Sequence, residues 1–227
     1  MNDNDIRITR RHSLVALGGF AAAILGWKAQ ASDGAGPAGV ASGAVSCVLA
    51  PEQTQGPYYV AAAKTRRNIT EGRPGTPLTL RTTVVDASTC KPIKGAAVDV
   101  WHADASGAYS GVQQNVGKTF MRGIQKTVAN GLATFKSVYP GWYPGRTVHI
   151  HVMVHIGGNV VHTGQLYFPD TVTDVAYTKA PYSSRGARDT RNANDSVYRN
   201  GGSKSLVTVQ ADSAGGYVAS IVTGVHR

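Results

Sequence analysis

The sequence is short of charge and contains no long helical pattern. Only 16% of its 227 residues are charged and 42% are hydrophobic, so a disordered chain is not expected. Beyond the first thirty residues, no window repeats its apolar positions every 3.6 residues, and no internal repeat is found. The length suits one domain with a core of its own.

Acidic residues are also scarce. The chain has 13 Asp and Glu against 23 Lys and Arg, which gives a net charge of +10. Such an excess can favour nucleic acid, an anionic envelope surface or acidic small molecules. The basic residues are scattered, however, and no run of them alternates with aromatic side chains, so no nucleic-acid partner is expected.

The apolar run from Leu14 to Trp27 is shorter than the ~20 residues that a membrane-spanning helix needs. The pair Arg10-Arg11 precedes it, and Ala29-Gln-Ala31 offers a small-residue cleavage site after it. We therefore predict a twin-arginine export signal over 1–31, periplasmic or secreted protein, and no stable membrane anchor. Residues 32–46, rich in Gly, Ala and Ser, are predicted to be a flexible leader.

Only two cysteines are present, Cys47 and Cys90. In an oxidising compartment a disulfide between them is expected, and two buried free thiols are the alternative. Neither cysteine stands beside a histidine in the sequence, which argues against a metal site that contains cysteine.

From Leu78 onward the chain consists largely of short runs rich in β-branched and aromatic residues. Gly, Pro, Asn or Asp separate most of these runs. This pattern predicts an all-β domain over 47–227, an antiparallel β-sandwich with long loops and little helix. Thr171 to Ser203 is polar and too long for a simple connection, so it is either a functional lid or a poorly ordered loop. The expected strands are Leu78–Asp86, Ala96–Ala103, Thr119–Thr127, Leu132–Val138, Thr147–Ile156, Asn159–Phe168, Ser205–Val209 and Gly216–Val225.

Two histidines on one expected strand, His149 and His151, could bind a metal. Alternate residues of a strand face the same side about 6.6 Å apart, so both imidazoles can reach one ion. His155 shares that face but lies about 13 Å beyond His151 by the same rise, which excludes it. Further ligands must come from elsewhere, and Tyr109 and Tyr143 are candidates, although a single tyrosine more often serves packing.

Several motifs, taken in order, resemble the intradiol ring-cleavage dioxygenases, the family of protocatechuate 3,4-dioxygenase and catechol 1,2-dioxygenase. The resemblance runs from about Cys47 to Phe168 and is closest to the short exported members. Its pieces are Leu49-Ala-Pro-Glu-Gln-Thr-Gln-Gly-Pro-Tyr-Tyr59, Val85-Asp86 with Cys90-Lys-Pro-Ile93, Val98-Asp-Val-Trp-His-Ala-Asp-Ala-Ser-Gly-Ala-Tyr-Ser-Gly111, Tyr139-Pro-Gly-Trp-Tyr-Pro-Gly-Arg-Thr-Val-His-Ile-His151 and His162-Thr-Gly-Gln-Leu-Tyr-Phe168.

The resemblance implies one Fe(III) per chain, held by Tyr109, Tyr143, His149 and His151 together with a hydroxide. Phenolates are hard anionic donors, which suits Fe(III) better than softer metals. The implied partners are a catechol-type substrate and O2. The implied reaction cleaves the ring between its two hydroxyl-bearing carbons and gives a muconate-type diacid, with Tyr143 as the ligand that leaves the metal and takes a proton.

Three further residues receive roles from the same resemblance. Arg146 would stabilise negative charge that develops on the substrate, as a preorganised cation can in a dry site. Gln165 would line the site, and Tyr58 would either wall the substrate pocket or serve packing. Relatives often carry Glu where this chain has Gln55, so no acidic role is expected there. The helical amino-terminal region of the catechol 1,2-type enzymes has no counterpart, so the resemblance implies no oligomeric state.

Two other functions remain open at this level. The rhythm of Asp86 to Val100 also suits a non-catalytic transthyretin-like binding or adhesion module, although such a module needs no tyrosines, arginine and histidines together. A zinc hydrolase would need a third ligand and a carboxylate base near His149, and no acidic residue lies within ten positions of it.

Overall fold

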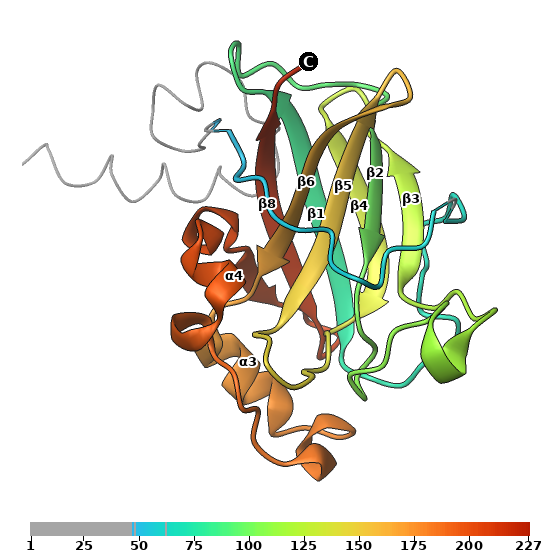
Figure 1. Ribbon diagram of the computed structural model, residues 1–227, viewed down its shortest axis with the longest axis vertical. Helices are drawn as coiled ribbons and strands as arrows, with labels where there is room; N and C mark the ends of the chain where they lie inside the picture. The colour runs from blue at the N-terminus through green and yellow to red at the C-terminus, as the bar shows by residue number, and fades with distance from the viewer. Residues whose placement is uncertain (1–46, 48, 62) are drawn as a thin grey trace, which may run out of the picture.

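Each β-rich run expected from the sequence overlaps a strand in the computed structural model, which describes residues 47, 49–61 and 63–227 (Figure 1). The run expected over Ser205–Val209 shares only Thr208 and Val209 with its strand, because Ser205 ends a short helix. The predicted export signal over 1–31 and leader over 32–46 lie outside the described residues. The strands are β1 (Pro77–Asp86), β2 (Ala97–Trp101), β3 (Arg122–Lys126), β4 (Leu132–Val138), β5 (His149–Ile156), β6 (Asn159–Tyr167), β7 (Thr208–Ala211) and β8 (Tyr217–Val225). The helices are η2 (Gln113–Asn115), α3 (Asp170–Tyr177), η3 (Tyr182–Arg185), η4 (Asn192–Asn194), α4 (Ser196–Arg199) and η5 (Gly202–Ser205).

The strands form two four-stranded sheets, ordered β4-β1-β8-β7 and β3-β2-β5-β6, which confirms the all-β sandwich. One strand pair differs from the antiparallel expectation, because β1 and β8 run parallel. These strands stand at opposite ends of the domain sequence, so no hairpin joins them and no tight turn forces them antiparallel. All other strand pairs are antiparallel.

The core lies between the two sheets, and strand alternation decides which side chains enter it. On β5, Ile150, Val152 and Val154 belong to the main apolar cluster. The intervening His149 and His151 therefore face the outer side of this sheet. Their sheet has a second layer over that outer face, because both histidines are buried as completely as the core residues.

That layer is an arm formed by residues 49–61 and 63–66. The arm starts at β8, where the Ala50 amide donates to Gly224 O. It then crosses β6, where the Gln53 amide donates to Thr163 O over 2.9 Å, and ends along β3, where the Ile124 amide donates to Lys64 O. Figure 1 shows this segment crossing in front of β6 and β5. The arm thus covers the outer face of the sheet above the outward-facing histidines.

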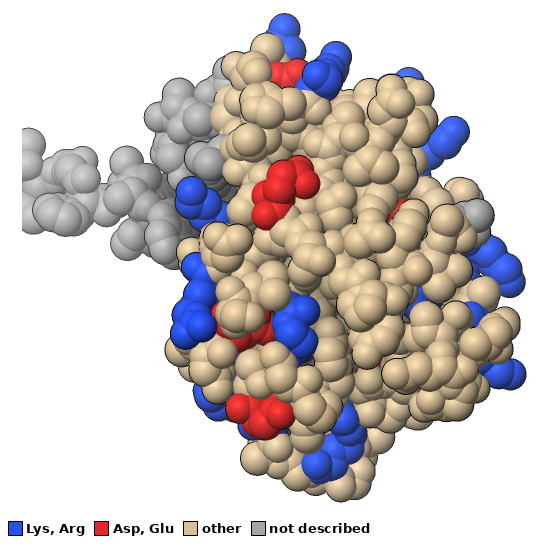
Figure 2. All heavy atoms as spheres, viewed as in Figure 1, with Lys and Arg blue, Asp and Glu red and all other residues tan. Residues whose placement is uncertain are grey.

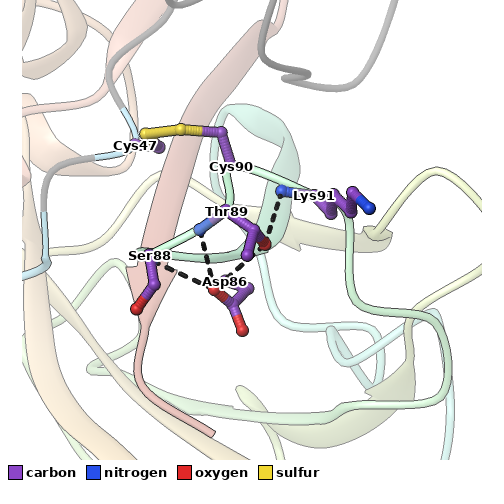
Figure 3. Close-up of a disulfide and its surroundings, with 6 residues drawn as sticks. All are labelled: Cys47, Asp86, Ser88, Thr89, Cys90 and Lys91. Carbon is purple, nitrogen blue, oxygen red and sulfur yellow. Dashed lines mark hydrogen bonds between the residues drawn. A yellow bond between two sulfur atoms is a disulfide. The ribbon is translucent and has the colours of Figure 1, made fainter.

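A disulfide fixes the start of the arm. Cys47 and Cys90 are joined with an S–S distance of 2.02 Å, and Cys90 follows the turn at the end of β1. The Asp86 carboxylate holds this turn by accepting hydrogen bonds from the amides of Ser88 and Thr89 (Figure 3). The bridge therefore connects the arm to a rigid corner of the sandwich.

The polar segment Thr171 to Ser203 is neither a simple connection nor an irregular loop. It folds into short helices that the sequence pattern missed, since α3 has eight residues and α4 only four. Its side chains enter the core as well. Tyr182 is 1% exposed, donates to Tyr139 O over 2.7 Å and accepts from the Thr76 amide. Figure 1 shows α3 and α4 together at one end of the sandwich.

Basic side chains lie mainly toward the edges of the face shown in Figure 2, and the middle of that face is mostly uncharged apart from one acidic patch. This view gives no continuous basic stripe of the kind that follows a nucleic-acid backbone. Among the helices that the structure describes, none is long and apolar enough to cross a bilayer.

Candidate metal centre

Two histidines and a tyrosine point their polar atoms at one another above β5. The Nε2 atoms of His149 and His151 are 3.2 Å apart, and the Oη of Tyr143 is 3.1 Å from His149 Nε2. Tyr143 comes from the turn before β5, where it forms a bridge with Arg146. The turn therefore brings Tyr143 back against His149, which follows it by six residues.

Tyr109 arrives from the loop after β2. Its ring centre lies 5.6 Å from that of Tyr143 and 6.2 Å from that of His151. The Asp104 carboxylate shapes this loop by accepting hydrogen bonds from the amides of Ser106 and Ala108. Tyr109 is only 5% exposed, and its buried Oη has no hydrogen-bond partner among the described residues. A buried hydroxyl without a partner costs about 1–3 kcal/mol, so this atom calls for a ligand.

Burial sets the protonation of these four side chains in the protein alone. It raises the pKa of Tyr109 well above its usual value, and the neighbouring Tyr143 raises it further. Burial also lowers the pKa of His149 to about 3 and holds the pKa of His151 well below its usual value. Both imidazoles are thus neutral near pH 7 and offer lone pairs, which is the form that binds metals.

The spacing of the donor atoms fits a first-row metal ion. Two ligands at about 2.1 Å from one metal and at about 90° to each other lie roughly 3.0 Å apart. The measured 3.1 Å and 3.2 Å separations match this value. The described residues contain no group of three or more His, Cys, Asp and Glu side chains that could hold a metal, so the tyrosines are needed to complete this site.

Neighbours fix the orientation of both imidazoles. The Nδ1 of His149 lies 2.6 Å from Thr147 O, so Nδ1 donates and Nε2 keeps its lone pair for a metal. The ring of His151 stacks on Trp101 at 4.9 Å with 3° between the planes. Gly56 of the arm approaches the same imidazole so closely that a Cβ there would stand 3.1 Å from His151 Cε1. His151 is therefore confined by both the sheet and the arm.

Arg146 stands beside the four donors with two of its nitrogen atoms occupied. Its Nε donates to Asp195 Oδ2 over 2.9 Å, and its Nη2 donates to Gln165 Oε1. Burial alone would lower the pKa of Arg146, but Tyr143 and Asp195 hold that pKa above its usual value. Gln165 is fixed in turn, because its Nε2 donates to Thr54 O over 2.9 Å. The arginine is thus a permanent, oriented cation.

Tyr58 of the arm lies over the two tyrosines. Its ring centre is 4.6 Å from that of Tyr109 and 6.2 Å from that of Tyr143, and its side chain is half-buried. These contacts show that Tyr58 packs against both tyrosines, and whether it also lines a substrate pocket stays a prediction.

The remaining histidines stay apart from this cluster. His162 is buried and binds Glu52 through Nδ1 over 2.9 Å. His102 is buried between Ala103 O and the Ser137 hydroxyl. His155 lies farther along β5, past a register shift. His149 and His151 are therefore the only described histidines whose ring nitrogens meet the tyrosines.

Sequence reasoning missed three residues of the site. Asp195 follows His149 by more than forty positions, so no local pattern connects them. Trp101 and Gly56 both lie inside the family-like motifs, but nothing in their sequence positions indicates a contact with His151. The signal that could have identified Gly56 is a glycine before proline in an otherwise extended arm, where a positive φ of 68° is needed.

Comparison with known proteins gives a consistent result. A family model described as "Dioxygenase" matches residues 54–190, which include the four donors, Arg146 and Gln165. An intradiol ring-cleavage dioxygenase structure from Tetranychus urticae has a TM-score of 0.75 and 36% identity, covering 79% of this chain and 95% of that one. The dioxygenase domain of a carbohydrate-binding fusion protein from Streptomyces sp. SirexAA-E has a TM-score of 0.61 and 31% identity, covering 78% and 98%.

Two curated proteins are similar over shorter stretches. Chlorocatechol 1,2-dioxygenase from Pseudomonas putida is 29% identical over 139 residues, which is 50% of this chain and 52% of that protein. Catechol 1,2-dioxygenase 1 from Acinetobacter lwoffii is 33% identical over 103 residues, or 41% and 32%. The matched region thus spans about half or less of the length of these curated relatives.

Proposed function

The chain belongs to the intradiol ring-cleavage dioxygenases, a family of enzymes, and we propose that it binds one Fe(III) and uses O2 to open a catechol-type ring. Cleavage would fall between the two hydroxyl-bearing carbons and give a muconate-type diacid. Membership of this family removes the reason to consider a transthyretin-like binding module.

The observation that carries this proposal is the meeting of the Tyr143 phenol oxygen with two neutral, buried imidazoles, beside a second buried phenol, that of Tyr109, whose oxygen has no partner among the described residues. Tyr109, Tyr143, His149 and His151 would hold the metal, through Oη of the tyrosines and Nε2 of the histidines. A ferric ion bound there would keep the phenols deprotonated and withdraw electron density from a catecholate ring. Both cysteines of the chain are paired in a disulfide, so no thiolate is available to favour a softer metal.

The two tyrosines are suited to different tasks. Tyr109 is 5% exposed and packs in a cluster with Trp101, Ala103 and Met153, so it is a fixed ligand. Tyr143 lies in the turn before β5, is half-buried and borders that cluster from outside. We assign to Tyr143 the acceptance of a proton from an incoming catechol hydroxyl at its Oη, since it can move without disturbing the core.

Arg146 is proposed to stabilise negative charge on the bound ring. Its Nε and Nη2 are held by Asp195 and Gln165, while its Nη1 makes no hydrogen bond to any described residue. That Nη1 is the donor left to face a substrate. In a site closed by Tyr58 and the arm, a preorganised charge of this kind is worth several kcal/mol in the transition state.

The substrate class is proposed from the relatives and the site together. The curated relatives carry the names of catechol and chlorocatechol dioxygenases. The aromatic wall of Tyr58 and the cation of Arg146 suit a planar, anionic ring. We therefore expect catechol or a substituted catechol as substrate, with O2 as the second reactant.

One experiment tests the proposed function directly. Purified full-length protein should contain about one iron per chain, be coloured by tyrosinate-to-iron charge transfer, and take up O2 with catechol, protocatechuate, hydroxyquinol or a substituted catechol. The product should be identified by mass as substrate plus both oxygen atoms. Arg146→Ala should keep iron and colour but lower kcat by about 10²- to 10³-fold. Colourless, iron-free protein after iron reconstitution would refute the ferric proposal, and coloured protein inactive on the whole panel would refute the substrate class.

We further propose that the enzyme works in the periplasm or outside the cell. The twin arginine Arg10-Arg11 and the disulfide between Cys47 and Cys90 both support export to an oxidising compartment. Changing Arg10 and Arg11 to lysine should retain the protein in the cytoplasm, as measured by cell fractionation. Unchanged export of this variant would refute the proposed route.

A further inference from the structure

We propose that Asp195 is the positioning residue that aims the Arg146 guanidinium at the substrate, an inference that rests on the proposed function. Asp195 lies 49 residues after Arg146 and beyond residues 54–190, which the dioxygenase family model matches. The segment between β6 and β7 would then complete the active site rather than only connect two strands.

Asp195 is buried and held in place by hydrogen bonds to both of its carboxylate oxygens. The residue is 1% exposed, and both carboxylate oxygens are fully engaged. Oδ2 accepts from Arg146 Nε over 2.9 Å and from the Thr147 amide over 2.7 Å. Oδ1 accepts from the amides of Val197 and Tyr198 over 2.7 Å and 2.9 Å. Four donors on one buried carboxylate leave it a single orientation.

This fixed carboxylate determines where the guanidinium plane can lie. Arg146 is held at Nε by Asp195 and at Nη2 by Gln165, which is itself held by Thr54 O. Two contacts at different edges of a planar group remove both its rotation and its tilt. Only Nη1 remains for a ligand, and its direction follows from the other two contacts.

Asp195 also provides the countercharge for a cation that is mostly withdrawn from water. The Arg146 side chain is 18% exposed, and Asp195 is the only described carboxylate within ion-pair distance of it. A buried charge without a partner is costly, so without Asp195 the arginine would turn toward solvent or toward other acceptors. Gln165 carries no charge and cannot replace this role.

The central test separates positioning from simple stabilisation. Asp195→Asn keeps the size of the side chain but loses its charge, so kcat should fall about 10- to 100-fold, as expected for a displacement on the order of 1 Å at a reacting centre. KM, iron content and the colour should change little. The matched control is Asp174→Asn, which removes an exposed carboxylate from the same segment, where it pairs with Arg188 and Arg191. This control should keep wild-type kcat.

A double-mutant cycle shows whether Asp195 acts through Arg146. In an Arg146→Ala background, Asp195→Asn should change kcat by no more than about threefold, because the group that it aims is absent. Wild-type kcat in Asp195→Asn would overturn the proposal. So would an equal loss from Asp195→Asn in both backgrounds, because this would mean that the carboxylate supports the fold alone.

A readout without turnover keeps the inference independent of the proposed function. The Nε–H proton of Arg146 should exchange with solvent at least about tenfold more slowly than the Nε–H protons of exposed arginines. The exchange is measured by nitrogen-detected NMR on full-length protein loaded with diamagnetic Ga(III). If the protein binds no Ga(III), the metal-free protein is used. Asp195→Asn should abolish this protection. If wild-type protein cleaves no catechol, the proposed function fails, but this measurement still tests the contact between Asp195 and Arg146. An unprotected Nε–H in the wild type would overturn the proposed role of Asp195.

Discussion

Gly56→Ala should weaken iron binding, because the arm and His151 touch at this glycine. Gly56 has a φ of 68°, and an added Cβ would stand 3.1 Å from Cε1 and 3.6 Å from Nε2 of His151. The imidazole must then move by a few tenths of an ångström. It cannot simply move back, since Trp101 stacks against it at 4.9 Å. The arm cannot easily lift either, because Gln53 is bonded to Thr163 and Val197.

The cost of Gly56→Ala has two contributions, one from the backbone at position 56 and one from the contact with His151. The left-handed backbone costs about 1–2 kcal/mol for alanine at any such position, partly offset by the smaller entropy of the unfolded chain. The contact with His151 adds a term that acts on the metal ligand itself. Displacing a ligand's support costs about 10- to 100-fold in metal affinity, or roughly 1.4–2.7 kcal/mol. The predicted loss of iron affinity lies in this range.

Gly72→Ala is the matched control for this prediction. Gly72 has a φ of 74°, and an added Cβ there meets nothing within 4 Å. Both variants therefore place alanine in a left-handed backbone, and only Gly56→Ala adds a contact with His151. Iron affinity should be measured by competition with a chelator, and unfolding should be compared in the metal-free proteins. Equal iron affinity of the two variants would show that the arm does not position His151.

Three further predictions concern other parts of the chain. Tyr109→Phe should lose more iron and more colour than Tyr143→Phe, because only Tyr109 is locked in the core cluster; equal iron contents and spectra would contradict the assigned roles. Cys90→Ser removes a link between residues 43 positions apart, and the free energy of unfolding in urea should fall by up to about 4 kcal/mol. Reduced wild-type protein is the control, and an unchanged midpoint would exclude a stabilising bridge. Burial lowers the pKa of His102 to about 4 from 6.5, so the unfolded chain takes up a proton more readily than the folded one. Unfolding free energy should therefore fall as the pH drops from about 6.5 to about 4, by at most roughly 3 kcal/mol. His102→Gln should flatten that part of the profile, and a slope identical to wild type would refute the assignment.

The sandwich was predictable because its strands carry their own signals. Alternation predicted that His149 and His151 share one face of a strand, and the structure confirms this, with Ile150 and Val152 on the opposite, core-facing side. Turn residues separated the other strands in the same way. The sequence could not indicate that β1 and β8 pair in parallel, because pairing between distant strands depends on the whole sheet rather than on either strand.

The site was predictable only where its residues lie close together in sequence or within a family motif. Tyr143, Arg146, His149 and His151 stand within ten residues, and the structure brings them together. Asp195 could not be found in this way, since it reaches Arg146 through tertiary folding of a segment without strong helical periodicity. The short helices of that segment are stabilised by caps and buried tyrosines, which periodicity does not detect.

In the proposed site, different parts of the chain support the metal and the substrate. The four proposed ligands lie on β5 itself or in the loop after β2 and the turn before β5, which adjoin the same sheet. Arg146 depends on contacts from outside that sheet, with Asp195 supplied by the later segment and Thr54 supplied through Gln165 by the arm. Changes in either flanking segment should therefore alter which ring is accepted and how fast it is cleaved before they alter iron binding. Gly56 and Tyr58 are exceptions to this division, because at these two residues the arm contacts proposed metal ligands directly.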